Sequence, residues 1–472
     1  MKLYEQLANS IAQSIHEGVL SRGDKLPSVR QASESRGFSP ATIFQAYYLL
    51  EARGLITARE RSGYFVTGSA FGIPPAPAPI AESNADSMQV DVSELVFEVL
   101  ESNISTHVVP LGSAFPSPFL FPLDQLSKCM ASGLQAMDPW SVMSNINRGD
   151  AELRRQIALR YMIAGLNIAT EDIIVTNGAL EALNLCLMAV TRPGDTVLIE
   201  SPTFFAALQS IERIGLRAVE IPSHPKDGID LVAMERAIIK HKPQACWVMT
   251  NFQNPLGSLM PETNKKALVD LITKYQLPLI EDDIYSELYL GDKRPLPAKA
   301  FDTDGLVMHC SSFSKCLAPG YRVGWVTPGR YVKAVERLKL TTTLSTSLPP
   351  QIAIAKYLQK GGYDKYLRNL RQTLLVNQIK FIEAIERYFP QGTCLTVPQG
   401  GYFLWVKLPD GVDALQLHQL AIADGISIAP GPIFSAQRKF TNYVRLNYGH
   451  NWDMRYEMSL NALGVIVKRL MP

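Results

Sequence analysis

Two kinds of hydrophobic periodicity alternate along the chain and divide it into regions. Over the first 67 residues, apolar positions recur three or four residues apart, as in YEQLANSIAQSIHEGVL. This stretch predicts a helix whose buried face carries Leu7, Ile11, Ile15 and Val19. Beyond about residue 110, short apolar runs alternate with helical stretches. The pattern predicts a small helical head and a larger α/β domain with a mainly parallel sheet.

Five apolar runs are predicted to be strands of this sheet. They are DIIVTNG (172–178), DTVLIESP (195–202), ACWVMTNFQNP (245–255), PLIEDD (278–283) and LVMHCSSFSK (306–315). Polar residues stand at their ends, where ligands of parallel sheets collect, so we expect a binding site at this edge. From about residue 331, a long helical stretch near 351–388 and the runs TVPQGGYFLWVKLP and NYVRLNYG predict a smaller α+β subdomain.

A proline-rich stretch separates the two regions. Residues 68–90 include GIPPAPAPI, with four prolines between positions 74 and 79. Proline removes backbone donors and favours extended geometry, so a semi-rigid linker is predicted. The expected division is a head over 1–67, the linker over 68–90 and an α/β domain over 91–472, with a large subdomain at about 110–330 and a small one at about 331–472.

The head pattern predicts a helix-turn-helix followed by a wing. A short second helix begins near Pro27 and Ser28, and Gly37 breaks it. Ser39 is the expected N-cap of a recognition helix that runs to Leu50, with Pro40 at its first position. Two short strands around residues 60–63 complete the wing.

These residues resemble the winged helix of GntR-type bacterial regulators over positions 3–67. The resemblance implies double-stranded DNA as a partner. It also implies that seven residues face the DNA: Arg30, Ser39, Thr42, Gln45, Arg61, Ser62 and Gly63. Pro40 and Phe44 stand where the family often has arginines, which leaves base readout open and phosphate contact expected. The alternative is a three-helix interaction module whose arginines form a solvated face.

The stretch SSFSKCLAPGYRVGW (311–325) places one lysine among hydroxyls, glycines and a second cation. A lysine amine becomes a nucleophile towards aldehydes when burial or neighbouring cations lower its pKa, and its common covalent partner is pyridoxal phosphate. Ser312, Ser314 and Arg322 could bind the phosphate of this cofactor. Gly178 and Ala179, at the start of a predicted helix, add free N–H groups to the phosphate site.

Other motifs match the remaining demands of the same cofactor. Asp282 in EDDIY follows an apolar run and is a candidate partner for the ring nitrogen. Tyr285 and Asn254 are candidate donors to the phenolic oxygen, and Phe204 could stack on the ring. Arg445 in NYVRLNYG is a candidate clamp for an α-carboxylate, so amino acids are the implied ligand class.

In this order the motifs resemble those of fold-type I, class I aminotransferases over about 105–470. Behind a GntR-type head and a proline-rich linker, the chain resembles a MocR-type regulator. The resemblance implies that Lys315 forms the internal aldimine with pyridoxal 5'-phosphate and that the other residues hold the cofactor and the ligand as described. It also implies a homodimer, head to tail, with sites at the subunit interface. Ala179 and Leu180 replace a common Ser-Gln, and Ser144 replaces a tyrosine lent by the partner.

Composition narrows the class of protein without naming the function. The 472 residues are 47% hydrophobic and 19% charged, which indicates a globular chain of several domains. The net charge is only +2, so contact with nucleic acid must come from a local patch. No signal peptide, membrane span or metal-ligand cluster stands out, and the six cysteines include no CxxC pair. We expect a cytoplasmic protein with reduced thiols that does not bind membranes.

Two function classes follow, and a third is weighed against them. The first is a transcriptional regulator that senses an amino acid, an amine or pyridoxal phosphate itself through exchange at Lys315. The second is a working aminotransferase with an appended DNA-binding head, for which the groups of a half-transamination are present. The third is a structural module that has lost the cofactor.

Overall fold

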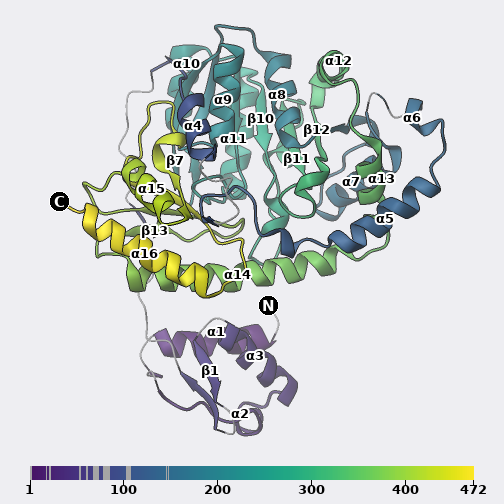
Figure 1. The fold of residues 1–472 in the computed structure, drawn as a ribbon. Helices are drawn as coiled ribbons and strands as arrows, with labels where there is room; N and C mark the ends of the chain where they lie inside the picture. Colours follow the sequence, from purple (N-terminus) through teal and green to yellow (C-terminus); the bar gives the residue numbers. More distant parts are fainter. Residues whose placement is uncertain are drawn as a thin grey trace.

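The computed structural model describes residues 3–16, 19–20, 23–52, 55–59, 62–66, 74–77, 86–101, 108–144, 146 and 148–472. We call residues 3–66 the head (Figure 1). Its elements are α1 (Leu3–His16), α2 (Val29–Arg36), α3 (Pro40–Ala52), β1 (Ile56–Arg59) and β2 (Gly63–Val66). Its core is separate from those of the other domain. Most of the predicted linker lies outside the described residues.

Helix α1 packs on α3 to form the core of the head. Leu7, Ile11 and Ile15 are buried as the periodicity predicts. The prediction for Val19 is wrong, since this side chain is 72% exposed. The reason is that α1 ends at His16 and the helical face does not continue to position 19.

The caps of the next two helices confirm the predicted helix-turn-helix. Ser28 caps α2 in a reciprocal arrangement with Gln31, and Gly37 ends the helix in the left-handed conformation at φ 68°. Ser39 Oγ accepts a hydrogen bond from the Thr42 N–H at 3.2 Å at the start of α3. β1 and β2 then form an antiparallel wing, and Arg61 lies outside the described residues.

A nine-stranded mixed sheet forms the centre of the large subdomain. Its strands are β3 (Met88–Gln89), β5 (Ile174–Thr176), β6 (Thr196–Ser201), β7 (Arg217–His224), β8 (Gly228–Ile229), β9 (Ala245–Val248), β10 (Leu279–Asp282), β11 (Val307–Ser312) and β12 (Gly324–Thr327). They follow the order β3-β7-β6-β9-β10-β11-β12-β5, with β8 paired to β7. The central strands from β7 to β11 run parallel, which confirms the predicted sheet.

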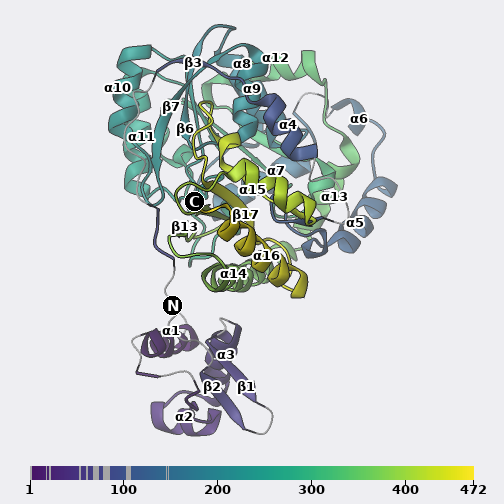
Figure 2. The ribbon, with the colours of Figure 1, turned by 60° about the vertical axis from the view of Figure 1, so that its left-hand side comes forward.

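Successive residues of the central strands bury opposite faces of the sheet. Leu279 packs against α10 and α11 on one face of the sheet, whereas Ile280 belongs to the hydrophobic core on the other face. Figure 2 shows these helix layers on the two sides of the sheet. The helices of the large subdomain are α4 (Ser93–Glu101), α5 (Leu123–Gln135), α6 (Ser141–Ser144), α7 (Ala151–Ile163), α8 (Ala179–Val190), α9 (Phe205–Ile214), α10 (Leu231–His241) and α11 (Glu262–Tyr275). The result is a three-layer α/β/α arrangement.

The small subdomain is built on a four-stranded antiparallel sheet. Its order is β13-β14-β17-β16. The strands are β13 (Cys394–Thr396), β14 (Phe403–Lys407), β16 (Ala429–Pro430) and β17 (Tyr443–Asn447), and β15 (Ile426–Ser427) pairs separately with β4 (Val109–Pro110). The helices α14 (Tyr363–Tyr388), α15 (Ala414–Ala423) and α16 (Met454–Leu470) complete this subdomain, whereas α12 (Val332–Thr342) packs on α8 and α13 (Leu348–Gln359) packs on α5 and α7 of the large subdomain. The predicted α+β subdomain is therefore present.

The single helical stretch predicted near 351–388 is wrong in one respect. Two helices, α13 and α14, occupy this region, and they meet at Gly361 and Gly362. Gly361 adopts φ 75°, which breaks the helix at a residue without a Cβ. Among the helices that the structure describes, none combines the length and the apolar character needed to span a bilayer.

Candidate functional site

The candidate residues gather at the carboxyl ends of the parallel strands. Asp282 is the last residue of β10, and Ser312 is the last residue of the neighbouring strand β11. The two strands are in parallel register, with Asp282 opposite Cys310. Lys315 follows three residues after the end of β11. Local chain geometry therefore brings the acid and the amine to the same edge of the sheet.

Lys315 is held in a buried and electropositive environment. Its Nζ donates a hydrogen bond to the carbonyl oxygen of Ala114 at 2.8 Å and lies 3.7 Å from the centre of the Phe115 ring. The pKa of Lys315 is lowered to about 7, chiefly by burial and also by the charges of Arg445 and Arg322, while Asp282 opposes the shift. The uncharged form of the amine, which a nucleophile requires, is therefore far more populated near neutral pH than in an ordinary lysine.

Asp282 is fully buried and has two unsatisfied oxygens. Neither carboxylate oxygen has a hydrogen-bond partner among the described residues. The pKa of Asp282 is raised to about 7, chiefly by burial and also by the adjacent Asp283, while Lys315 opposes the shift. A buried acid without a partner is costly in a structural role, so this carboxylate fits a site that receives a ligand cation or N–H.

A second group of residues forms a cradle beside Lys315. Arg322 adopts φ 51°, and its guanidinium reaches Ser314 Oγ at 3.4 Å and the carbonyl of Asn177 at 3.5 Å. A Cβ on Gly178 would lie 2.4 Å from Arg322 Nη2 and would displace the guanidinium, and the φ of 80° also favours glycine here. Ser312 Oγ accepts the Ser314 N–H at 3.3 Å. Hydroxyls, a cation and an open backbone thus meet as the phosphate assignment requires.

Helix α8 points its first residues at this cradle. Gly178 is its N-cap, with φ 80°, and Ala179 is its first residue. The side chain of Leu180 is 43% exposed and lines an outer groove with Asn184 and Arg322, so only its backbone N–H could serve a phosphate.

Arg445 and Asn254 link the two subdomains across the pocket. Arg445 Nη1 donates to Asn254 Oδ1 at 2.9 Å, and Nη2 donates to the carbonyl of Gly112 at 2.7 Å. The guanidinium lies 4.2 Å from the centre of the Phe403 ring, and burial lowers the pKa of Arg445 to about 10. Asn254 Nδ2 has no partner in the described part of the chain. One amide proton donor is therefore left for a ligand.

Aromatic residues line the remaining walls. Tyr285 is buried and makes edge contacts with Tyr402 and Phe403, with ring centres 5.5 and 5.7 Å apart. Phe204 caps the N-terminus of α9, is half-buried, and packs on Phe205 at 4.8 Å. No described contact joins Phe204 directly to Asp282 or Lys315, so its stacking role stays a prediction.

Sequence reasoning missed the loop that covers Lys315. Residues 112–115 supply carbonyl groups to both Arg445 and Lys315. Asn447 of β17 holds this loop, donating from Nδ2 to the carbonyls of Ser113 at 2.9 Å and Phe115 at 2.7 Å. The only local signal was the glycine in PLGSAFPSP, because backbone carbonyl contacts leave no mark on residue identity.

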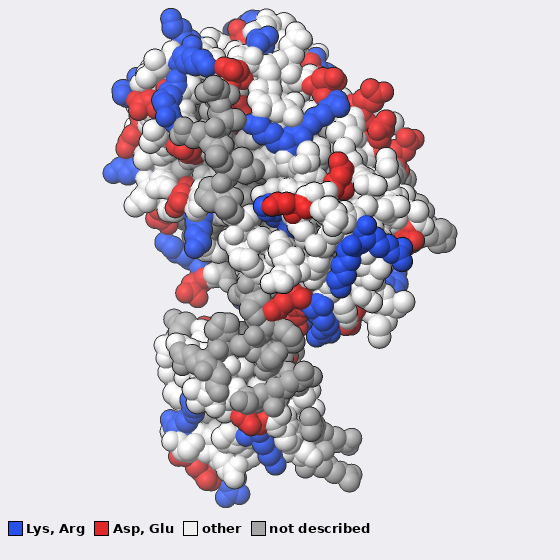
Figure 3. Space-filling model, turned by 90° about the vertical axis from the view of Figure 1, so that its left-hand side faces the viewer, with Lys and Arg blue, Asp and Glu red and all other residues white. Residues whose placement is uncertain are grey.

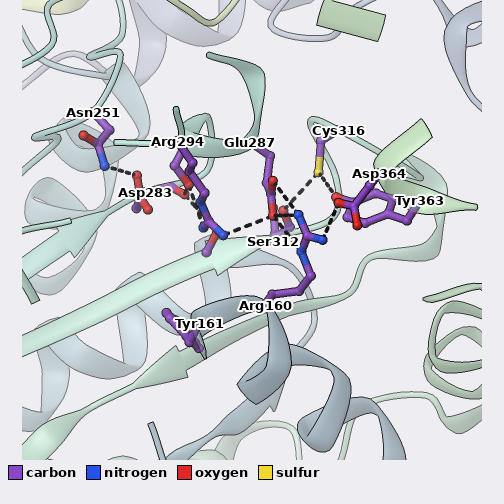
Figure 4. Close-up of polar contacts among 12 residues, drawn as sticks. Arg160, Tyr161, Asn251, Asp283, Glu287, Arg294, Ser312, Cys316, Tyr363 and Asp364 are labelled. Carbon is purple, nitrogen blue, oxygen red and sulfur yellow. Dashed lines mark hydrogen bonds and ion pairs between the residues drawn. The ribbon is translucent and has the colours of Figure 1, made fainter. Parts of the chain in front are cut away.

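A buried ionic network beneath the strands was also missed (Figure 4). Glu287 pairs with Arg160 at 3.0 Å and with Arg294 at 3.1 Å. Nearby, Asp283 accepts from Asn251 at 2.9 Å and pairs with His309 at 3.0 Å. These contacts fix the segment that follows Asp282, and we assign them a positioning role because none reaches Lys315.

The pocket as a whole fits pyridoxal 5'-phosphate. Asp282 offers free oxygens to a pyridine nitrogen, and Asn254 offers a free N–H to a phenolic oxygen. Gly178 and Arg322 leave a cradle suited to a phosphate. Lys315 supplies an amine that is partly uncharged. These demands are separate, and one pocket meets all of them.

The head presents most of its candidate DNA contacts to solvent. Five of these residues are exposed: Arg30, Ser39, Gln45, Ser62 and Gly63. Thr42 is half-buried, and its hydroxyl lies 2.9 Å from Ser39 Oγ. Arg30 also pairs with Glu34 on the surface of α2 at 3.1 Å. On the molecular face drawn in Figure 3, basic and acidic side chains are interspersed.

Comparison with known proteins supports both halves of this picture. The family model "Aminotransferase class I and II" matches residues 126–458, and "Bacterial regulatory proteins, gntR family" matches residues 3–66. Two proteins of Escherichia coli K12 named as uncharacterized HTH-type transcriptional regulators, YdcR and YjiR, are similar to the chain, with identities of 44% over 99% of both chains and 35% over 100% of both.

Solved structures resemble the larger domain. The kynurenine aminotransferase of Pyrococcus horikoshii, solved with PMP, aligns with a TM-score of 0.75 and 29% identity, over 81% of this chain and 96% of that one. The agreement confirms the expected fold class and the expected cofactor type. The chain belongs to the family of HTH-type transcriptional regulators that join a GntR-type head to a class I and II aminotransferase domain.

Proposed function

We propose that this protein is a pyridoxal phosphate-dependent transcriptional regulator. In this proposal the head binds operator DNA, and the larger domain senses an amino acid or an amine at Lys315. Relatives named as regulators match the chain from end to end, which supports the regulator over an enzyme with an accessory head. The observation that carries the sensing half is the coexistence, in one buried pocket, of a partly uncharged Lys315 and an unpartnered Asp282.

The cofactor supplies an aldehyde that bonds reversibly to primary amines and a ring that withdraws electrons. Lys315 would hold the cofactor through its amine, and a ligand amine would compete with it for the same aldehyde. Asp282 keeps a proton at the pyridine nitrogen, and Asn254 and Tyr285 donate to the phenolic oxygen. Ser312, Ser314, Arg322 and the N-terminus of α8 hold the phosphate. Arg445 binds the carboxylate of the ligand.

A ligand changes DNA binding only if it favours one arrangement of the protein over another. Arg445 lies on the small subdomain, and Lys315 and Asp282 lie on the large one. An amino acid bound to both stabilises the state in which the two subdomains are closed. Loading of Lys315 by pyridoxal phosphate alone is a second candidate signal.

We propose further that the protein acts as a homodimer. Five large apolar side chains between positions 119 and 143 are exposed in the single chain, and the most exposed are Phe119 (90%), Trp140 (77%) and Met143 (63%). Exposed apolar groups of this size are typical of interfaces. A groove lined by Leu180 and Arg322 lies on the same subdomain and would be available to a partner chain. The backbone at position 144 is helical, and its side chain lies outside the described set.

The direct test is an absorbance titration of the purified full-length protein. Pyridoxal phosphate is added first and then a panel of amino acids and amines. We expect a cofactor band that is absent in Lys315→Ala and shifts with the effector. Salt-dependent binding to a DNA fragment from its own upstream region tests the head. A protein with neither band nor DNA binding contradicts the proposal.

The competing function is a working aminotransferase. All of its residue types are present, and the larger domain resembles solved aminotransferases. A multiple-turnover assay with the same amino acids and 2-oxo acids separates the two. Turnover of about 1 per second or more, as in ordinary enzymes, would assign the chain to enzymes. We expect at most a slow single exchange.

A further inference from the structure

A groove beside the Asn254–Arg445 contact, on the face of the small sheet that carries Arg445, has no assigned role. It has a volume of about 580 Å³ and lies between the two subdomains. The small subdomain contributes Trp405, Phe440 and Tyr443 to its walls, and the large subdomain contributes Pro202 and Leu231. The three aromatic rings contact one another, and Trp405 stacks on Tyr443 with ring centres 5.3 Å apart.

The proline-rich linker reaches this groove. Pro77 is buried and forms part of the groove wall, although Pro75 and Ala76 beside it are exposed. Pro75 also accepts a hydrogen bond from the Leu395 N–H at 3.0 Å. Leu395 belongs to β13, the edge strand of the small sheet, whose outward backbone groups would otherwise lack a strand partner.

We propose that this groove is an intramolecular docking site for the linker segment Pro74–Pro77, and that docking fixes the chain that follows the DNA-binding head at the junction of the two subdomains. Aromatic grooves recognise proline-rich segments because the extended conformation is preformed and loses little entropy on binding. Proline has a carbonyl acceptor but no N–H donor, so Pro75 can satisfy an edge strand without extending the sheet. The inference rests on the proposed function only for its regulatory consequence.

The linker has a second attachment, on the large subdomain. Ser87 receives two hydrogen bonds from Arg217 of β7, at 2.8 and 2.6 Å, and β3 (Met88–Gln89) pairs with β7. Asp86 pairs with Lys240 at 2.8 Å. The chain is therefore bonded to the small subdomain at Pro75, borders both subdomains at Pro77, and is fixed to the large subdomain at 86–89. The described attachment nearest the head is the Pro75–Leu395 bond to the small subdomain.

A single side chain, Phe434, connects the docking groove to Arg445, the proposed binding residue for the ligand carboxylate. Trp405 of the groove stands opposite Arg445 in the β14–β17 register. Phe434 contacts both, with its ring centre 5.4 Å from that of Trp405 and 5.2 Å from the Arg445 guanidinium carbon. A ligand that shifts Arg445 with its subdomain thus also shifts the surface that holds the linker.

Amide hydrogen exchange on the full-length protein tests the docking. The variants are Pro77→Gly and its matched control Ala76→Gly, which adds the same flexibility at an exposed neighbour. We expect the peptide containing residues 394–396 to exchange roughly tenfold faster in Pro77→Gly, because release of the linker frees the Leu395 amide. Ala76→Gly should stay within about twofold of the parent. Faster linker cleavage by protease should accompany release.

Two results would overturn the docking site. Unchanged exchange in Pro77→Gly would mean that the linker does not protect Leu395. Equally faster amide exchange in both variants would mean that the added flexibility of glycine causes the effect, and not the loss of the Pro77 side chain from the groove. Neither result depends on cofactor binding, since the reaction of Lys315 with pyridoxal phosphate is measured separately by absorbance. Failure of the docking can therefore be told apart from failure of the proposed sensor.

Discussion

Arg445 of the small subdomain donates to Asn254 Oδ1 of the large subdomain at 2.9 Å. The bond orients the Asn254 amide and leaves its Nδ2 without a partner among the described residues. The candidate clamp for a carboxylate therefore also orients the candidate donor to the phenolic oxygen of the cofactor. Ligand recognition and cofactor binding share one contact.

Replacing Asn254 tests this shared contact. Asn254→Ala should weaken pyridoxal phosphate binding by roughly tenfold, the loss typical of one hydrogen bond to a charged group. The measurement is an absorbance titration of the cofactor-free protein. Asn264→Ala, in the separate groove of the linker, is the matched control and should bind like the parent. Equal affinities for all three proteins would remove Asn254 from the site.

The lowered pKa of Lys315 predicts the pH dependence of cofactor loading. Only the uncharged amine reacts, so a pKa of about 7 should make the rate rise roughly tenfold between pH 6 and 8 and then level off. An ordinary lysine would give a rise of roughly a hundredfold that continues beyond pH 9. Stopped-flow absorbance over this range decides between the profiles, and Lys315→Ala provides the baseline.

The ionised Asp282 carboxylate should lower the free energy of unfolding of the cofactor-free protein. Its folded pKa of about 7 lies above the unfolded value, so its contribution is favourable at low pH and is lost as pH rises through 7. Asp282→Asn should therefore raise the melting temperature at pH 8 more than at pH 5. The gain is at most about 4 kcal/mol, and lost attraction to Lys315 offsets part of it.

Asp302→Asn is the contrasting control for this experiment. The Asp302 carboxylate pairs with Lys299 at 2.9 Å and accepts two backbone N–H groups, and these contacts hold its pKa below the usual value. This replacement should lower the melting temperature at pH 8. If both variants lose stability at pH 8, the Asp282 carboxylate is not the uncompensated charge described above.

Arg445 should distinguish ligands that carry a carboxylate from those that do not. Arg445→Lys keeps the positive charge but loses the planar guanidinium that can form two parallel hydrogen bonds to a carboxylate. The affinity for amino acids should therefore fall by roughly tenfold or more. Simple amines without a carboxylate should bind both proteins equally. The readout is the spectral titration of the cofactor-loaded protein. An equal loss for both ligand types would point to a general disturbance of the pocket.

Arg30 should contribute phosphate contact and little base readout. Arg30→Ala should lower the slope of log affinity against log salt by about 1 and weaken all DNA sequences similarly. Fluorescence anisotropy at several salt concentrations measures this slope. Arg337→Ala, an exposed arginine on α12, is the matched control. A loss restricted to one DNA sequence would instead make Arg30 a base-reading residue.

Local patterns in the sequence were sufficient for several features of the fold. Apolar periodicity located the head helices and the central strands, and Ser28, Gly37 and Ser39 marked helix ends because capping involves residues within three or four positions. The same logic brought Asp282 and Lys315 together, since they end adjacent parallel strands. Local patterns failed where periodicity continued past a break, at Val19 and at Gly361.

The sequence alone therefore determined the two-part architecture, the strand-end location of the pocket and its chemical groups. Only the tertiary structure decided which distant groups meet. Asn254 contacts Arg445, Ala114 contacts Lys315, and Pro75 contacts Leu395 through the packing of the subdomains. Such contacts depend on three-dimensional packing, which no local period encodes. Burial, which shifts the pKa values of Lys315 and Asp282, is likewise a property of the folded chain.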